Sequence, residues 1–255
     1  MLKKRIVIKV GSNVLTREDG KLDITRLSSL VDQIAWLRQK NYEVILVTSG
    51  AVASGRGELK TNHQLDSVEQ RQLFSAVGQV KLINLYYDLF REFGIHIGQV
   101  LTMKSNFETE RESENQRACM EVMLENEVLP IVNENDTVCV TELMFTDNDE
   151  LSGLIAMMMG AKTLVILSNI DGIYNGNPND PESEVIRKVN PNEDLSKYIS
   201  TEKSGHGRGG MVSKCNIALK VAKAGIKVII ANGSRDNILV NLAEKPEETI
   251  HTEFA

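Results

Sequence analysis

Two lysines far apart in the sequence are the first candidates for chemistry. Lys9 ends an apolar, β-forming run and is followed closely by Gly11, and Lys214 comes shortly after a glycine-rich stretch. Burying an ammonium group is costly unless an anion neutralises it, although a lysine at a strand end often reaches solvent instead. The glycine favours an anionic partner for Lys9, because backbone N–H groups can approach a phosphate closely there.

An acidic cluster is the second candidate. Asp147 and Asp149 flank Asn148 at the start of a predicted helix. Acidic residues are common at helix N-termini because they cap free N–H groups and complement the helix dipole, which is a sufficient explanation for this cluster taken alone. Two anion-binding lysines also need a carboxylate to orient them, however, and this cluster could supply one.

Small and polar residues follow four of the predicted strands. They are Gly11-Ser12, Ser49-Gly50, Asn133-Glu134-Asn135-Asp136 and Ser168-Asn169. Ligands of open α/β sheets bind at the carboxyl ends of the strands. We therefore predict a ligand site at these ends, with glycine loops at Gly11 and Gly50 that suit a phosphate and a carboxylate. Each loop taken alone could also be a tight turn.

A glycine-rich segment at residues 204–211 matches two known patterns but lacks their context. Gly205, Gly207 and Gly210 have the spacing of a dinucleotide-binding loop and of the protein kinase glycine loop. No strand is predicted before the segment, and the other protein kinase motifs and the P-loop pattern are absent from the sequence. An oxidoreductase and a P-loop nucleotidase are therefore disfavoured, and the segment is predicted to lead into a helix that begins near Met211.

The elements that must position these residues alternate between strands and helices. Six runs rich in Val, Ile and Leu predict buried parallel strands, and four segments with apolar residues at the helical period predict helices between them. The strands are predicted at 5–10, 43–48, 95–101, 128–133, 163–167 and 227–231, and the helices at 24–38, 68–90 (bent near Gly78), 147–159 and 211–224. This order predicts an α/β fold with a mostly parallel sheet and helices on both faces.

Two stretches break the alternation. Residues 137–145 alternate apolar and polar side chains, which predicts a hairpin or an edge strand. Residues 171–210 are polar and hold three of the five prolines, which predicts a flexible lid or binding loop with a weak helix near 194–198. Because no convincing linker appears, we predict a single domain with two lobes.

Composition and charge exclude several classes of protein. The chain has 255 residues, 42% hydrophobic and 25% charged, and a net charge of −6 that argues against nonspecific nucleic-acid binding. The three cysteines and four histidines lack metal-ligand spacing, so we predict reduced thiols and no protein-built metal site. No apolar run is long enough for a signal peptide or a membrane span, so we expect a cytoplasmic protein without a membrane partner.

Six short motifs, spread over nearly the whole chain, resemble those of the amino acid kinase family. They are Lys9-Val10-Gly11-Ser12, Thr48-Ser49-Gly50-Ala51-Val52, Ala76-Val77-Gly78-Gln79, Asn133-Glu134-Asn135-Asp136-Thr137-Val138, Asp147-Asn148-Asp149-Glu150-Leu151-Ser152 and Gly209-Gly210-Met211-x-x-Lys214. The fourth and fifth motifs resemble the branch that phosphorylates glutamate in proline biosynthesis. The resemblance implies a three-layer αβα sandwich, with an amino-acid-binding N-lobe at about 1–160 and a nucleotide-binding C-lobe at about 161–255.

The resemblance also implies roles for individual residues. Lys9 and Lys214 would stabilise the transferred phosphoryl group, and Asp149, with Asp147, would orient them. The implied glutamate-binding residues are Ser49, Gly50, Asn133, Asp136 and Asn148. The implied nucleotide-binding residues are Lys9, Gly11, Ser12, Ser168, Asn169, Arg208, Gly209, Gly210, Met211 and Lys214, and ATP would come with Mg²⁺. Many family members have Thr-Asp where this chain has Ser168-Asn169.

From this resemblance we expect ATP-dependent phosphorylation of the side-chain carboxylate of L-glutamate. The alternatives are another kinase of the family, acting on N-acetylglutamate or a nucleoside monophosphate, and a sensor that binds amino acid and nucleotide without turnover. The resemblance further implies a homodimer or homotetramer and proline as a feedback inhibitor. Many bacterial relatives carry a C-terminal RNA-binding PUA domain, and we expect none within these 255 residues.

Overall fold

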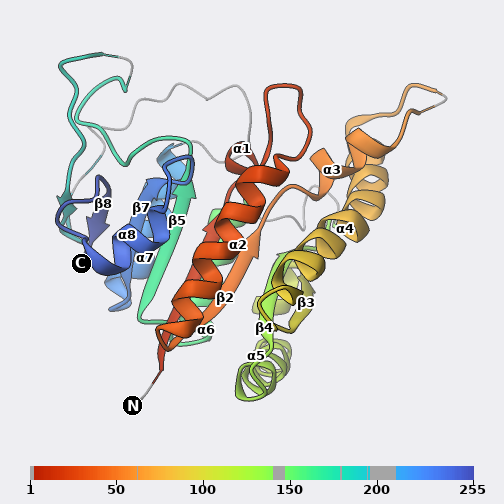
Figure 1. Ribbon diagram of the computed structural model, residues 1–255, viewed down its shortest axis with the longest axis horizontal. Helices are drawn as coiled ribbons and strands as arrows, with labels where there is room; N and C mark the ends of the chain where they lie inside the picture. The colour runs from red at the N-terminus through yellow and green to blue at the C-terminus, as the bar shows by residue number, and fades with distance from the viewer. Residues whose placement is uncertain (1–2, 62, 140–146, 179, 194, 196–210) are drawn as a thin grey trace.

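The centre of the fold is one eight-stranded sheet, shown in the computed structural model in Figure 1. The structure describes residues 3–61, 63–139, 147–178, 180–193, 195 and 211–255. The strand order is β3-β4-β2-β1-β5-β7-β8-β6, and every described pair is parallel except β7 with β8. The strands are β1 (Lys4–Val10), β2 (Tyr42–Thr48), β3 (Ile97–Thr102), β4 (Leu129–Glu134), β5 (Thr163–Ser168), β6 (Lys188–Val189), β7 (Lys227–Asn232) and β8 (Thr252–Phe254). The six predicted strands are all present, and the prediction of a mostly parallel sheet is confirmed.

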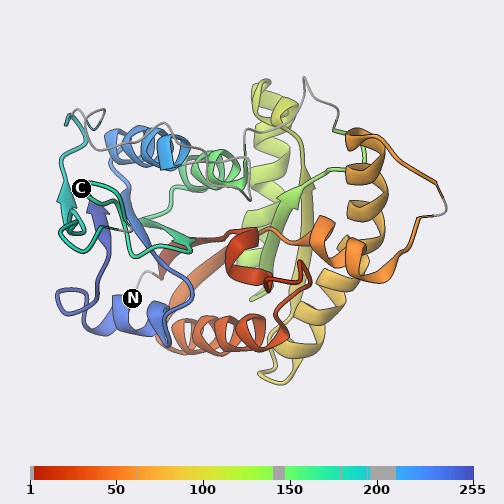
Figure 2. The same ribbon diagram turned by 90° about the horizontal axis from the view of Figure 1, so that it is seen from above.

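Helices cover both faces of the sheet, so the predicted three-layer sandwich is confirmed as well. Figure 2 shows α2 and α8 on one face and α5, α6 and α7 on the other. The helices are α1 (Ser12–Leu15), α2 (Ile24–Gln39), α3 (Ala51–Glu58), α4 (Ser67–Arg91), α5 (Glu110–Glu125), α6 (Asn148–Met158), α7 (Met211–Lys223) and α8 (Ile238–Glu244), with a 3₁₀ turn η1 (Lys104–Phe107).

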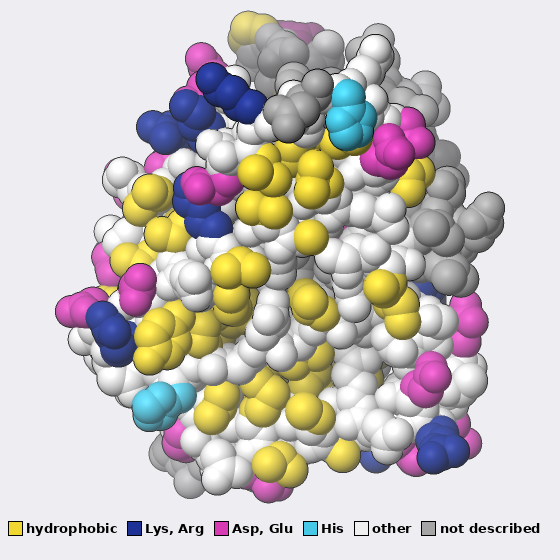
Figure 3. Space-filling view, turned by 90° about the vertical axis from the view of Figure 1, so that its right-hand side faces the viewer, with side chains coloured by type: hydrophobic (Ala, Val, Ile, Leu, Met, Phe, Trp, Pro, Cys, Tyr) yellow, Lys and Arg dark blue, Asp and Glu magenta, His cyan; other side chains and the backbone are white. Residues whose placement is uncertain are grey.

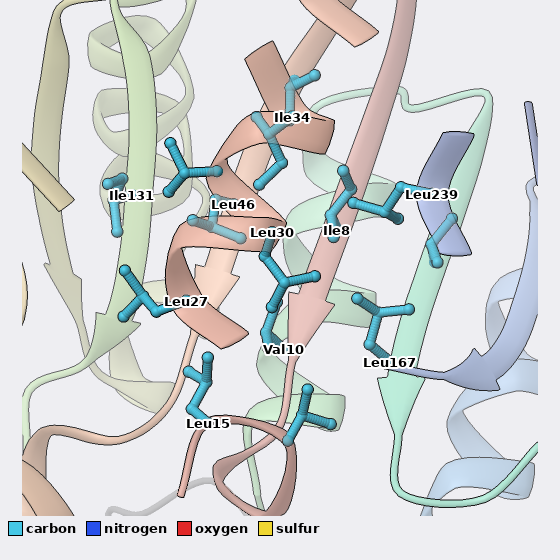
Figure 4. Close-up of a cluster of buried hydrophobic side chains, with 14 of the residues drawn as sticks. Ile8, Val10, Leu15, Leu27, Leu30, Ile34, Leu46, Ile131, Leu167 and Leu239 are labelled. Atoms are coloured by element: carbon cyan, nitrogen blue, oxygen red, sulfur yellow. The ribbon is translucent and has the colours of Figure 1, made fainter. Parts of the chain in front are cut away.

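The two faces of the sheet carry separate apolar cores because successive side chains of a strand point to opposite faces. In β1, Ile8 and Val10 belong to the core that packs against α2, where they lie near Leu30 (Figure 4). Val7 belongs to the other core, which α6 and α7 cover. Lys9 alternates in step with Val7, so its side chain lies on the face of α6 and α7 and not under α2.

The four strand ends singled out from the sequence lie next to one another. β4, β2, β1 and β5 are consecutive neighbours in the sheet, and all four run in the same direction. The loops after them are joined by backbone hydrogen bonds, from the Ser49 N–H to the Val10 carbonyl oxygen (3.1 Å) and from the Gly11 N–H to the Leu167 carbonyl oxygen (3.4 Å). The sheet therefore gathers the candidate residues at one edge.

Several elements have no clear signal in the sequence. α5 is rich in charged residues and buries only Met120 and Leu124, so its apolar period is too faint to detect. α3 is short and contains two glycines, and α8 has only 7 residues. These elements form because the sheet provides a surface for their few apolar side chains, which outweighs a weak local preference.

The described part of the predicted loop after β5 contains regular backbone pairing that the sequence did not indicate. Tyr174 forms a β-bridge with Val185, and β6 pairs with β8. The hydroxyl of Thr252 accepts a hydrogen bond from the Ile173 N–H (2.8 Å) and donates one to the Ile186 carbonyl oxygen (2.7 Å). Residues 196–210 and 140–146, which include most of the predicted weak helix and hairpin, lie outside the described residues.

Gly78, in the middle of α4, allows a close helix crossing. α4 runs unbroken from Ser67 to Arg91 past the predicted bend. A Cβ atom at Gly78 would lie 1.8 Å from the Ala51 carbonyl oxygen, and one at Gly55 would lie 1.9 Å from the Phe74 carbonyl oxygen. The backbones of α3 and α4 are therefore in direct contact, and no larger residue fits at either glycine without moving a helix.

Substituting Gly78 should accordingly destabilise the fold. We expect Gly78→Ala to lower the free energy of unfolding by about 3 kcal/mol, at the upper end of overpacking effects, because backbone atoms must move. Gly57→Ala is the matched control, since its Cβ would meet only the Lys21 Cγ atom, at 3.7 Å. Chemical denaturation of both variants checks this, and a Gly78→Ala protein as stable as Gly57→Ala would show that α3 and α4 separate at little cost.

Candidate active site

A buried carboxylate joins the two lysines that were singled out from the sequence. Asp149 is 0% exposed, and its two oxygens lie 2.6 Å from the Lys9 Nζ atom and 2.9 Å from the Lys214 Nζ atom. Both lysine side chains are themselves largely buried. We call Lys9, Asp149 and Lys214 the Lys–Asp–Lys cluster. It places two cations around one anion at the edge of the sheet where the strand ends meet.

Three elements position this cluster. Lys9 is the penultimate residue of β1, Asp149 lies in the first turn of α6, and Lys214 lies in the first turn of α7. The two helices approach closely at Gly153, where a Cβ would lie 2.9 Å from the Ile217 side chain. Close packing of α6 on α7 therefore brings Lys214 to Asp149.

The two aspartates of the acidic motif have different environments. Burial works against ionisation of Asp149, but the charges of Lys9 and Lys214 outweigh it and lower the pKa of Asp149 to about 2. For Asp147, burial and then the negative charge of Asp149 raise the pKa. Asp149 therefore stays ionised at neutral pH, as a counter-ion to two lysines must.

Asp147 has the capping role that its position suggested. Its Oδ1 atom accepts hydrogen bonds from the N–H groups of Asp149 (2.9 Å) and Glu150 (3.1 Å). Its Oδ2 atom accepts one from the Ser213 hydroxyl of α7 (3.2 Å). Asp147 thus fixes the start of α6 and joins it to α7, whereas Asp149 contacts the lysines directly.

Both predicted glycine loops have physical reasons for glycine. A Cβ at Gly11 would lie 3.1 Å from the Lys9 Nζ atom, so a side chain there would crowd the ammonium group. Gly50 has a φ of 104°, in the left-handed region that favours glycine, and it caps the N-terminus of α3. Ser12 begins the short helix α1 beside them. Gly11 and Gly50 are the N-caps of α1 and α3, so the N-termini of these two helices lie at the edge of the sheet that holds the lysines.

A chain of side-chain amides lies at the ends of β2 and β4. The Asn148 Nδ2 atom donates to the Thr48 carbonyl oxygen (2.8 Å), the Ser49 hydroxyl (2.9 Å) and the Asn133 Oδ1 atom (3.0 Å). The Asn133 Nδ2 atom in turn donates to the Oε1 atom of Gln79 in α4 (2.9 Å). Asn148 therefore contacts both Ser49 and Asn133, and all three are predicted substrate residues.

Asp136, another predicted substrate residue, is held by an arginine that no sequence motif indicated. The Arg71 guanidinium in α4 donates to Asp136 Oδ1 through Nε (2.7 Å) and to Glu134 through Nη2 (2.7 Å). All three side chains are at most 13% exposed. Arg71 precedes its two partners by more than sixty residues, so only the packing of α4 against the end of β4 reveals the cluster.

The predicted nucleotide residues are only partly described. Ser168 ends β5 and is buried, and Asn169 is exposed beyond it. Met211 begins α7, whereas Arg208, Gly209 and Gly210 lie outside the described residues. The structure therefore places Ser168, Asn169, Gly11 and Ser12 at the same sheet edge as the Lys–Asp–Lys cluster.

A further ion pair at this end was not predicted. Asp171 accepts hydrogen bonds from Arg235 Nη2 (2.7 Å) and Asn232 Nδ2 (3.1 Å), which ties the end of β5 to the end of β7. The hydrogen bond from Arg235 is the main cause of the lowered pKa of Asp171.

Among the described residues, no three His, Cys, Asp or Glu side chains gather as a metal site. The same part of the chain contains no helix that is both long and apolar enough to cross a membrane. The paired ammonium groups, the helix N-termini and the amides at this end of the sheet together suit the binding of anions and the stabilisation of negative charge.

The chain belongs to the amino acid kinase family, whose sequence model matches residues 4–232. It is 66% identical over 250 residues to the glutamate 5-kinase of Bacteroides thetaiotaomicron, covering 98% of this chain and 69% of that protein. It is 50% identical over 245 residues to the glutamate 5-kinase of Chlorobaculum tepidum, covering 94% of this chain and 66% of that protein. The resemblance inferred from the six motifs is confirmed.

Solved structures confirm the fold at much lower sequence identity. The UMP kinase of Ureaplasma parvum superposes with a TM-score of 0.68 at 18% identity, and the two chains cover each other fully. The carbamate kinase of Giardia lamblia bound to AMP-PNP gives a TM-score of 0.71 at 15% identity, with 99% of this chain and 98% of that chain covered.

Proposed function

We propose that this chain transfers the γ-phosphoryl group of ATP to the side-chain carboxylate of L-glutamate. The observation that carries the proposal is the Lys–Asp–Lys cluster, in which one fully buried carboxylate holds two ammonium groups within 2.6 and 2.9 Å. The identity to the two glutamate 5-kinases favours this substrate over N-acetylglutamate, a nucleoside monophosphate and a sensor without turnover.

The reaction needs alignment and charge stabilisation more than proton transfer. A glutamate carboxylate oxygen forms a bond to the γ-phosphorus as the bond to the β–γ bridging oxygen breaks, and ADP leaves with the released electron pair. The attacking carboxylate is already ionised at neutral pH, so no general base is required. Lys9 and Lys214 would offset the negative charge that spreads over the transferred group, and Asp149 would keep both ammonium groups in place.

The two substrates would approach from opposite sides of this cluster. The amino acid would bind on the side of β2 and β4, where Ser49, Asn133, Asp136 and Asn148 lie, within an N-lobe of about residues 1–160. The nucleotide would bind on the side of β5, near Ser168 and Asn169, within a C-lobe of about residues 161–255. The strand order supports this division, because β1 with Lys9 lies between β2 and β5.

Magnesium would accompany the nucleotide. Mg²⁺ is usually held by one or two carboxylates together with substrate phosphates and water, which fits a site whose described residues build no cage of their own. When bound, the ion would neutralise part of the charge on the β- and γ-phosphates. The residues of the chain would still have to align the glutamate carboxylate and stabilise the transferred group.

A substrate panel tests the proposal. ATP consumption is measured with glutamate, N-acetylglutamate, aspartate and UMP supplied separately, and the acyl phosphate is trapped with hydroxylamine. We expect turnover with glutamate alone. Turnover with N-acetylglutamate or UMP instead would show that the proposed substrate is wrong. Binding of ATP and glutamate without turnover would establish a sensor.

We also propose that two copies of the chain associate through the side formed by α4, β3 and α5. β3 is an edge strand of the sheet. The exposed apolar residues of these elements, and of the turn that follows α4, are Val80, Tyr87, Phe93, Leu101 and Val122. Figure 3 shows apolar side chains gathered on this side of the molecule. Sedimentation equilibrium tests this, and a Tyr87→Glu protein with the mass of the unsubstituted oligomer would count against this side.

Proline is proposed to act as a feedback inhibitor, in keeping with the expected place of the enzyme in proline biosynthesis. Inhibition by proline that glutamate relieves would support binding at or near the amino-acid site. Activity that is unchanged by millimolar proline would contradict the proposal.

A further inference from the structure

In the amide chain at the ends of β2 and β4, the donor and the acceptor of each hydrogen bond can be assigned. The Thr48 carbonyl oxygen can only accept a hydrogen bond, so the Asn148 atom 2.8 Å from it must be the amide nitrogen. The Glu134 backbone N–H can only donate, so the Asn133 atom 2.9 Å from it must be the carbonyl oxygen. These two backbone groups therefore identify the nitrogen and the oxygen atom of each asparagine amide.

Gln79 completes this chain. Since the Asn133 carbonyl oxygen faces Asn148 and the Glu134 N–H, the Asn133 amide nitrogen is turned to α4, where the Gln79 Oε1 atom accepts from it at 2.9 Å. Asn133 is only 3% exposed and Gln79 only 9%. Without an acceptor at position 79, a buried N–H group would lose its partner, which is costly enough to turn or shift the amide.

At the opposite end of the amide chain, the Asn148 carbonyl oxygen is an acceptor that can bind a ligand. The Asn148 nitrogen is turned to three protein acceptors, and within the described part of the structure no donor lies at hydrogen-bonding distance from the Asn148 carbonyl oxygen. Asn148 is partly exposed at the proposed amino-acid site. Both carboxylates of glutamate can only accept hydrogen bonds at neutral pH, so its α-ammonium group is the one part of glutamate that can donate to this oxygen.

We propose that Gln79 is a positioning residue for the amino acid substrate. Through Asn133 it holds the Asn148 amide so that its carbonyl oxygen accepts a hydrogen bond from the free α-ammonium group of glutamate. Asp136, whose Oδ1 atom is held by Arg71, follows Asn133 by three residues and is a second predicted substrate residue at the end of β4. This inference rests on the proposed function and adds to it the feature by which a free amino group is recognised.

The test compares glutamate with glutarate, which lacks only the amino group. We expect the unsubstituted enzyme to prefer glutamate by about 100-fold or more in kcat/KM, and Gln79→Met to reduce that preference about tenfold through a higher KM for glutamate. The KM for ATP should not change. Gln79→Glu should restore the KM for glutamate to within about threefold, because a carboxyl group offers an acceptor oxygen to Asn133 whether or not it is protonated.

Gln70→Met is the matched control. Gln70 lies on the same helix, and its side chain donates to the Leu65 carbonyl oxygen, away from the amide chain. A Gln79→Met enzyme with the glutamate preference of Gln70→Met would overturn the inference. If Gln79→Met does not fold, the unsubstituted enzyme still tests the inference. Equal kcat/KM values for glutarate and glutamate would overturn the inference. Absence of glutamate turnover in the unsubstituted enzyme would instead contradict the proposed function.

Discussion

Replacing Asp149 by asparagine is expected to lower kcat about 100-fold or more. Asparagine has the same shape as aspartate but carries no charge, so the Lys9 and Lys214 ammonium groups would repel each other with no anion between them. They would separate, which removes charge from the place where the phosphoryl group is transferred. Steady-state kinetics with saturating ATP and glutamate measure the effect.

Glu150→Gln is the control for this substitution. It makes the same chemical change one residue further along α6, where Glu150 pairs with Lys104 at 3.0 Å. We expect its kcat to stay within about threefold of the unsubstituted enzyme, as is usual for a surface ion pair. An Asp149→Asn enzyme as active as Glu150→Gln would show that the buried carboxylate does not organise the lysines.

The low pKa of Asp149 adds a test by acid denaturation. Because the folded-state pKa of about 2 lies below the ordinary value of 3.8, ionised Asp149 stabilises the folded state above pH 3.8, and this contribution is lost as the pH falls towards 2. The difference in unfolding free energy between the unsubstituted protein and Asp149→Asn should therefore be constant from about pH 5 to 8 and shrink below about pH 4. If this difference in unfolding free energy instead grew towards low pH, the pKa of Asp149 in the folded state would not be lowered, and the prediction would be wrong.

Removing either lysine should lower kcat by as much as Asp149→Asn does, or by more. We expect Lys9→Ala and Lys214→Ala each to lose roughly 10²–10³-fold in kcat, because each deletes a cation beside the transferred group. Each also leaves Asp149 buried with a single counter-ion, so circular dichroism must show that the variants are folded. Lys223→Ala, which removes an exposed lysine of α7, should retain full activity.

The two lysines should act as a unit. If Asp149 holds both in one arrangement, the Lys9→Ala/Lys214→Ala double variant should lose far less than the product of the two single losses. Losses that multiply would indicate two independent binding contacts. A fully active Lys214→Ala enzyme would remove that residue from the mechanism altogether.

Sequence patterns predicted the central part of the fold well because they reflect burial directly. The strands buried on both faces appear as continuous apolar runs, and the polar residues after them mark the carboxyl ends of parallel strands. Elements that are half exposed or short, such as α5 and α8, were not predicted, because their few buried side chains leave little periodic signal. Their formation depends on the surface that the sheet offers them.

The sequence alone determined which residue types were available for chemistry, namely Lys9, Lys214 and an acidic motif between them. It left open whether Lys9 faces solvent or an anion, and which aspartate of the motif is a helix cap. Tertiary structure decided both, since strand alternation turns Lys9 to the face that α6 and α7 cover, and the contact of α6 with α7 brings Lys214 to Asp149. The pairing of Arg71 with Asp136 and the pairing of Gln79 with Asn133 also emerged only from the structure, because a partner more than fifty residues away has no fixed spacing in the sequence.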